Sequence, residues 1–214
     1  MKVEIWADII CPWCGLGSNR LEEAVARLDP SDDVEVVHRS FQLDPSFPPD
    51  RTTSVAEMLQ STKALTPLQV GQMTSRVERL ANDDGLIPYR VLDNRVGNTA
   101  LAHELLAYAT EQGRHAEAWK TMFRAYFGEA RSIFDQASLL ELATQEMGLD
   151  GDGVSEALTS RRFRDRVRAD QIEAQQLGAR GVPFVVVDRR YGVAGAQPVS
   201  QLLSVLERAR QEVA

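Results

Sequence analysis

The stretch Val3–Cys14, with the sequence VEIWADIICPWC, holds the residues that decide the fold. Its first part, Val3–Ile10, is rich in β-branched and aromatic residues and predicts a short strand. The only cysteines of the chain follow at once, Cys11 and Cys14, separated by a Pro-Trp dipeptide. Pro12 suits the first turn of a helix. The stretch therefore predicts a strand that leads through a Cys-x-x-Cys segment into a helix.

A helix and a second strand are predicted after the cysteines. Apolar residues on one helical face predict a helix over Leu21–Leu28, and Asp29-Pro30 ends it. Val34–Phe41 has the composition of the next strand. A strand, a helix and a strand joined over this length usually form a right-handed parallel βαβ unit. We expect such a unit at the start of the chain.

The middle of the chain predicts helices only. The proline-rich segment Gln42–Arg51 indicates a connection that leaves the first unit. Thr66–Gln69 carries helix-start signals and is followed by an apolar stripe that ends before Gly85. Further helices are predicted over Asn98–Thr110, His115–Phe127, Asp135–Met147 and Ser155–Leu177, the last of them polar.

The pattern returns to strands after Gly178. Strands are predicted over Phe184–Val187 and Tyr191–Ala194, and a final amphipathic helix over Gln201–Val213. The order of elements predicts an α/β protein in which a discontinuous sheet domain, residues 1–45 plus 178–214, is interrupted by an all-helical insertion, residues 46–177. The last helix of the insertion, about residues 155–177, is a candidate to pack back on the sheet.

Composition excludes several classes of protein. With 214 residues, 43% hydrophobic and 26% charged, the chain is long and apolar enough for a substantial core. The net charge of −7 opposes binding to a phosphate backbone, so we expect no nucleic-acid partner. The apolar runs, such as Val182–Val187, are far shorter than the ~18 residues of a membrane-spanning helix. Because the first residues also lack the apolar core of a signal peptide, we expect no membrane partner and a cytoplasmic location.

The position of the cysteines favours redox chemistry. At the start of a helix, unsatisfied N–H groups and the helix dipole stabilise a thiolate on Cys11. Cys14 lies one turn further and can resolve a mixed disulfide. Two alternatives remain. The thiols can be an unreactive half-buried pair, or they can bind zinc, which needs further ligands from histidines that form no spaced pair, His38, His103 and His115.

The sequence resembles the DsbA-like branch of the thioredoxin superfamily, and within it the FrnE-type proteins. The resemblance covers essentially the full length of the chain. The motifs that carry it are Val3–Cys14, Arg39–Pro45 (RSFQLDP), Asn98-Thr99 with Ala102-His103, Phe123–Phe127 (FRAYF), Gly181–Phe184 (GVPF) and Gly195–Pro198 (GAQP).

The resemblance implies a thioredoxin-like fold with an inserted helical domain. It implies that Cys11 is the exposed nucleophile and Cys14 the resolving thiol. It also implies a cis peptide bond between Val182 and Pro183 beside the cysteines, which leaves the backbone of Val182 available to an extended substrate or to glutathione. Pro12 and Trp13 complete the expected substrate-binding residues. We expect no metal and no bound cofactor, with glutathione as a candidate co-substrate.

The sequence departs from the family pattern directly after the cysteines. Where family members usually have an aromatic residue, Ile, Gly and Lys, this chain has Gly15–Arg20, GLGSNR. Glycines in the first helical turns cost on the order of 1 kcal/mol each relative to alanine, unless close packing requires them.

These features predict a thiol:disulfide oxidoreductase that exchanges disulfides with protein or small-molecule partners. The alternative is a glutathione-dependent isomerase or transferase of the 2-hydroxychromene-2-carboxylate isomerase or kappa type, proteins that look similar but usually carry Ser at the nucleophile side of the motif. A third hypothesis is a binding or chaperone module that does not need its cysteines. An apolar strip on the inserted helices is compatible with a homodimer.

Other chemistry-bearing residues favour structural roles. His103 is more typical of a structural histidine than of a ligand-binding one. The position of Asp8 before the cysteines is compatible with proton relay if its side chain is buried, and with a solvated strand end if it is not. We expect the aromatic residues Trp119, Phe123, Tyr126 and Phe127 in the core, and a solvated helix, paired with Asp165 and Asp170, for the basic residues Arg161, Arg162, Arg164, Arg166 and Arg168.

Overall fold

The computed structural model describes residues 1–29 and 33–212 and divides into two compact units. One unit comprises Met1–Leu43 and Arg168–Ala214, and the other comprises Asp44–Val167. The domain boundaries predicted at 45/46 and 177/178 stay a prediction, because compact units are not by themselves domains that fold alone. Pro30 and Val213, predicted to lie at helix ends, are outside the described residues.

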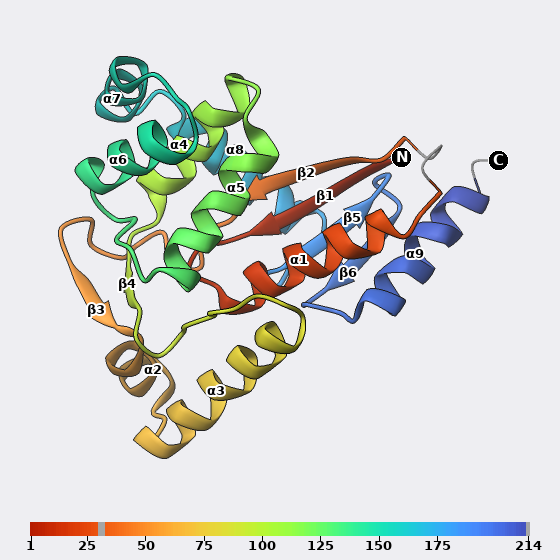
Figure 1. Ribbon diagram of the computed structural model, residues 1–214, viewed down its shortest axis with the longest axis horizontal. Helices are drawn as coiled ribbons and strands as arrows, with labels where there is room; N and C mark the ends of the chain where they lie inside the picture. The colour runs from red at the N-terminus through yellow and green to blue at the C-terminus, as the bar shows by residue number, and fades with distance from the viewer. Residues whose placement is uncertain (30–32, 213–214) are drawn as a thin grey trace. The chain divides into compact units, whose positions relative to one another are not determined.

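The first unit is built on a four-stranded sheet of order β2-β1-β5-β6 (Figure 1). β1 pairs parallel with β2, and the β1–β5 and β5–β6 pairs are antiparallel. The predicted βαβ start is confirmed. The elements of this unit are β1 (Lys2–Ala7), α1 (Pro12–Ala26), β2 (Glu35–Ser40), β5 (Phe184–Val187), β6 (Tyr191–Ala194), α9 (Val199–Gln211) and the C-terminal part of α8 (Arg164–Gln176).

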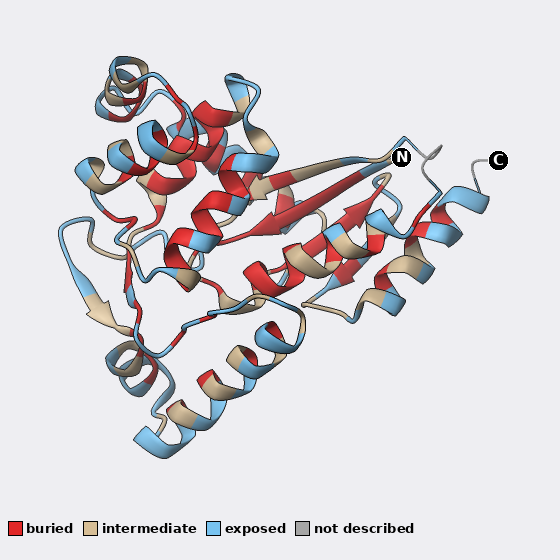
Figure 2. Cartoon of the chain, viewed as in Figure 1, coloured by how far each residue is buried: buried red, intermediate tan, exposed pale blue. Residues whose placement is uncertain are grey.

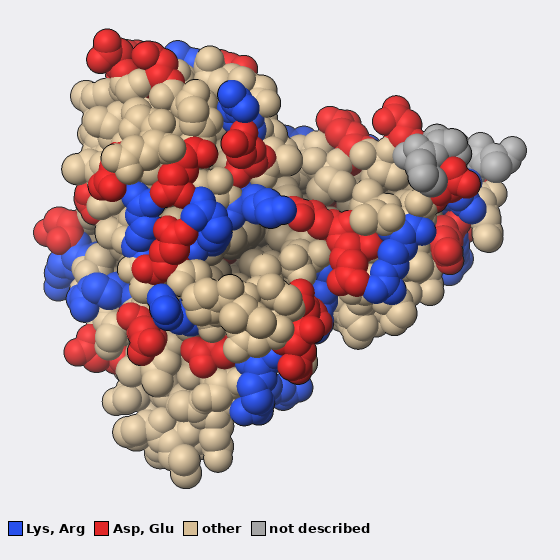
Figure 3. All heavy atoms as spheres, in the orientation of Figure 1, with Lys and Arg blue, Asp and Glu red and all other residues tan. Residues whose placement is uncertain are grey.

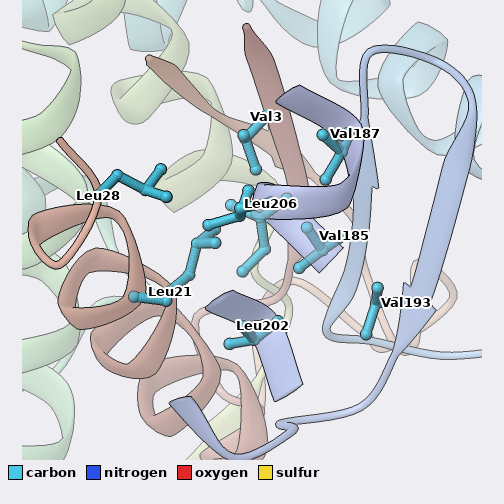
Figure 4. Close-up of a cluster of buried hydrophobic side chains, with 11 residues drawn as sticks. Val3, Leu21, Leu28, Val185, Val187, Val193, Leu202 and Leu206 are labelled. Atoms are coloured by element: carbon cyan, nitrogen blue, oxygen red, sulfur yellow. The ribbon is translucent and has the colours of Figure 1, made fainter. Parts of the chain in front are cut away.

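Alternate residues of β1 serve opposite faces of this sheet. Val3 and Ile5 join a buried cluster with residues of α1 and α9, among them Leu21 and Leu206, which point toward one another in Figure 4. Trp6 lies on the other face and clusters with residues of α8 and β5. Figure 2 shows β1 buried along nearly its whole length. A strand buried on both faces gives the cysteine turn that follows it a rigid base.

The second unit is mostly helical, but the prediction that it is all-helical is wrong. Antiparallel strands β3 (Thr52–Ser54) and β4 (Arg95–Gly97) pair within it. These strands are too short for alternation to reveal them in the sequence. The helices are α2 (Val55–Lys63), α3 (Pro67–Asp83), α4 (Ala100–Glu111), α5 (His115–Phe123), the π-helical turn η1 (Arg124–Gly128), α6 (Gln136–Glu146), α7 (Gly151–Thr159) and the start of α8.

The predicted single helix Ser155–Leu177 is wrong, since α7 and α8 are separate helices. The helical backbone is interrupted at Arg161, which has a left-handed conformation with φ of 55°. The Arg161 guanidinium donates to the buried carboxylate of Glu104, with Nη2 2.7 Å from Oε1. A charge-assisted bond to an otherwise buried carboxylate offsets the cost of the backbone conformation. The helix-start signal at Thr66–Gln69, in contrast, is confirmed as a capping box on α3.

The apolar character of the helices and the charge of the surface also bear on function. None of the helices in the part of the chain that the structure describes combines the length and apolar character needed to cross a membrane. On the face shown in Figure 3, acidic and basic side chains lie interleaved.

Candidate active site

Cys11 lies in the turn between β1 and α1, at the N-cap of the helix. Its backbone is extended, with φ of −81° and ψ of 113°, and Pro12 takes the first helical position. The carbonyl of Cys11 accepts the first intrahelical bond, from the Cys14 N–H at 2.9 Å. The helix therefore begins directly behind the Cys11 sulfur, where backbone dipoles favour negative charge.

The Val182–Pro183 peptide bond lies against this sulfur. The Cys11 thiol donates to the Val182 carbonyl, with Sγ and O 3.6 Å apart. The bond is cis, as the family resemblance implies. Residues that are far apart in the sequence thus meet at Cys11, as the resemblance predicts.

The cysteines are less accessible than predicted. Cys11 is 5% exposed, so the expectation of an exposed nucleophile is corrected to one with a small accessible surface. Cys14 is fully buried at 0%. Pro12, Trp13 and Val182 are partly buried around them. The accessible part of the Cys11 sulfur is therefore small.

The environment of Cys14 keeps this thiol protonated. Burial raises its pKa well above the ordinary value, and the hydrogen bond and charge of Cys11 raise the pKa further. A hydrogen bond with the backbone of Asp8 acts in the opposite direction. The thiolate is the nucleophile in disulfide chemistry, so a raised pKa lowers the reactivity of Cys14 near neutral pH.

Asp8 is buried, so the alternative of a solvated strand end is wrong, and proton relay stays a prediction. Its side-chain Oδ2 accepts the Leu43 N–H at 2.7 Å, and its carbonyl accepts the Cys11 N–H at 3.2 Å. Its charge is one of the influences that raise the pKa of Cys14. Asp8 therefore ties the segment that follows β2 to the cysteine turn and places a carboxyl group beside the buried thiol.

Close packing explains one of the glycines that follow the cysteines. A Cβ on Gly17 would lie 2.8 Å from Pro183 Cγ and 3.5 Å from Ala196 Cα. One turn further along α1, Arg20 Nη1 donates to the Ala196 carbonyl at 2.9 Å. Sequence reasoning missed Arg20, because nothing in the local pattern shows that the GAQP segment lies against α1.

The remaining residues singled out from the sequence lie in positions typical of structural roles. His103 is fully buried beside the Trp119 ring. The arginines of the basic cluster are exposed as predicted, and Asp170 pairs with Arg39 of β2. Within residues 1–29 and 33–212, metal-binding side chains form no group of three or more. The predicted core assignment is confirmed for the aromatic residues Trp119, Phe123, Tyr126 and Phe127, none more than 9% exposed.

Comparison with known proteins agrees with this geometry. A probable DsbA oxidoreductase of Streptomyces coelicolor has a similar structure, with a TM-score of 0.94, 43% sequence identity and coverage of 99% of this chain and 91% of that chain. A 2-hydroxychromene-2-carboxylate isomerase shares the fold, with a TM-score of 0.75, 18% identity and coverage of 100% and 98%. The thioredoxin-like fold with a helical insertion is thereby confirmed.

Sequence comparison leads to the same family. The uncharacterized protein YwbO of Bacillus subtilis (strain 168) is 29% identical over 167 residues, 77% of this chain and 75% of that protein. The family model of the DSBA-like thioredoxin domain matches residues 2–207, which includes both units. The chain therefore belongs to the DSBA-like thioredoxin domain family, with Cys11 and Cys14 as its Cys-x-x-Cys pair.

Proposed function

We propose that this DsbA-like oxidoreductase exchanges disulfides with protein or small-molecule partners through Cys11 and Cys14. The observation that carries the proposal is the unequal pair of thiols at the start of α1. Cys11 caps the helix and contacts the Val182 carbonyl, while Cys14 is buried behind it with a raised pKa. Such an arrangement supplies one attacking and one resolving sulfur.

The reaction proceeds in two exchange steps. The Cys11 thiolate attacks one sulfur of a partner disulfide, which forms a mixed disulfide and expels the other sulfur as a thiolate that takes a proton from water. Cys14 then loses its proton and attacks Cys11 Sγ, which expels the second partner thiolate. The partner gains two electrons and two protons, and the protein is left with a Cys11–Cys14 disulfide.

Return to the dithiol needs a second thiol pair. Two molecules of glutathione can supply it, attacking the internal disulfide in turn and leaving as glutathione disulfide. The Val182 backbone, together with Pro12, Trp13 and Pro183, forms the proposed contact surface for the partner. The motifs shared with FrnE-type proteins support that subtype, and the cytoplasm, which keeps ordinary thiols reduced, is the proposed compartment.

Single cysteine variants test this proposal. With a peptide disulfide as substrate, Cys11→Ser should abolish exchange. Cys14→Ala should form the mixed disulfide and stall there, and this product is detectable by mass under non-reducing conditions. Retained turnover in Cys11→Ser would contradict the mechanism.

The same variants distinguish the glutathione-dependent isomerase or transferase. Such an enzyme needs only one sulfur, which activates or positions glutathione. Full activity of Cys14→Ala in a glutathione-dependent assay, without accumulation of a mixed disulfide, would favour this alternative over the oxidoreductase.

A further inference from the structure

Helix α1, which begins at the cysteines, contacts the Val182–Pro183 segment and its surroundings at several positions along its length. The Val182–Pro183 segment is here called the proline loop. At the start of α1, the Cys11 thiol donates to the Val182 carbonyl at 3.6 Å. Further along, Gly17 packs against Pro183, and Arg20 donates to the Ala196 carbonyl at 2.9 Å.

The proline loop is itself bound to the segment that Arg20 holds. The Gly195 N–H donates to the Pro183 carbonyl at 2.8 Å, and Gly195 directly precedes Ala196. Arg20 therefore acts on the proline loop indirectly. It binds Ala196, and the neighbouring Gly195 binds the Pro183 carbonyl. All of these contacts lie within the sheet unit, which gives them a shared rigid frame.

Gly17 sets the closest approach of the loop to the helix. A Cβ at this position would meet Pro183 Cγ at 2.8 Å and Pro183 Cβ at 3.4 Å. Ordinary carbon contacts begin near 3.4 Å. A methyl group 2.8 Å from Pro183 Cγ would therefore displace the Pro183 ring by about 0.6 Å. The ring cannot retreat freely, because the Pro183 carbonyl is already bound to Gly195.

We propose that Gly17 and Arg20 are positioning residues for disulfide exchange, which hold the proline loop at the distance that sets the Val182 backbone against the Cys11 sulfur. This inference rests on the proposed function. Gly17 lies against Pro183, and Arg20 binds the Ala196 carbonyl. Their effect is to orient a partner backbone at Val182, where misplacement by less than an ångström slows a reaction that depends on aligned atoms.

The test compares two rates for each purified full-length variant. One is the rate of exchange between the dithiol protein and a peptide disulfide, which requires the proline loop. The other is the rate of Cys11 alkylation by iodoacetamide, a small reagent that requires only an accessible thiolate. Gly17→Ala should slow exchange by about tenfold or more while alkylation changes by less than about twofold.

Gly71→Ala is the matched control. Gly71 also lies inside a helix, α3, and a Cβ there meets nothing within 4 Å. Both rates should equal those of the wild-type protein. This control separates the contact with Pro183 from the general effect of alanine on helix stability.

Arg20 variants keep the inference falsifiable if Gly17→Ala fails to fold. Arg20→Leu removes the donor to Ala196 and should slow exchange more than alkylation, and Arg20→Lys, which retains a donor, should restore part of the rate. Folded Gly17→Ala and Arg20→Leu proteins with wild-type exchange, or with both rates lowered equally, would overturn the inference. A wild-type protein without exchange would instead refute the proposed function.

Discussion

At the residue scale, the burial of Cys14 has a consequence for stability as well as for chemistry. Its folded-state pKa is raised mainly by burial, so the folded dithiol keeps a proton that the unfolded chain loses. Between the ordinary thiol pKa of about 8.5 and the raised value, the folded state binds more protons than the unfolded state. The free energy of unfolding therefore falls as pH rises through this range.

The predicted slope is up to about 1.4 kcal/mol per pH unit for this single thiol. Urea unfolding of the reduced protein between about pH 7.5 and 10 measures it, with Cys14→Ala as the control that lacks the titrating group. Equal pH dependence in the two proteins would show that Cys14 titrates normally.

Glu4 is a second residue whose environment predicts a measurable effect. It lies on β1, is 1% exposed, and accepts from Arg39 Nη2 and Arg189 Nη2, each at 2.8 Å. Glu4→Gln removes the buried negative charge, so the guanidinium groups of Arg39 and Arg189 lose this partner charge. Arg189 is partly exposed and therefore screened by water, so we expect a loss of about 2 to 3 kcal/mol rather than the full cost of a buried pair.

The matched control is Glu23→Gln, in the exposed pair of Glu23 with Arg27 on α1. This change should cost less than about 0.5 kcal/mol. Denaturant unfolding of both variants measures the difference. Similar losses in the two variants would mean that the network around Glu4 is not a buried one in solution.

At the scale of elements, the start of α2 depends on a reciprocal cap. The Ser54 side chain accepts the Glu57 N–H at 3.1 Å, and the Glu57 carboxylate accepts the Ser54 N–H at 3.0 Å. Ser54→Ala should destabilise the protein by about 1 kcal/mol. Ser61→Ala is the control, since Ser61 lies inside the same helix and donates only to the Met58 carbonyl.

The same cap predicts a titration. Hydrogen bonds from Thr53 and from the backbone and side chain of Ser54 lower the pKa of Glu57 to about 2. Its contribution to stability is present above the unfolded pKa of about 4.3 and is lost as pH falls through the folded value. An NMR titration of the Glu57 carboxyl carbon measures this midpoint, and a midpoint near the unfolded value would contradict the cap.

Elements of regular period were predictable from the sequence, and elements set by distant contacts were not. The continuous apolar run Phe184–Val187 and the capping signals at Thr66 are local and were predicted correctly. The break at Arg161 depends on Glu104, which is remote in sequence. Strands β3 and β4 depend on each other in the same way.

The candidate site shows the same division. Cys11 and Cys14 were recognisable from their spacing, and Val182-Pro183 from the family resemblance. The cost of the glycine at Gly17 was also visible, but its reason, the Pro183 ring, lies at the other end of the chain. Arg20 carries no local signal at all, because an arginine on a helix is usually a solvated side chain.

At the scale of the whole molecule, the sheet unit brings together segments from both ends of the chain. The nucleophile comes from the first residues, while the carbonyl that contacts it and the turn held by Arg20 come from the last part. Unfolding of either segment therefore removes the site. We expect activity and sheet structure to be lost together on denaturation.

The central claim is that Cys11 and Cys14 form a reversible redox pair, and a redox titration tests it most directly. The purified protein is equilibrated in glutathione buffers, free thiols are alkylated, and the products are counted by mass. We expect reversible interconversion of dithiol and internal disulfide at a potential within roughly −270 to −120 mV. A pair that stays reduced throughout, or that forms only a glutathione adduct on Cys11, would contradict it.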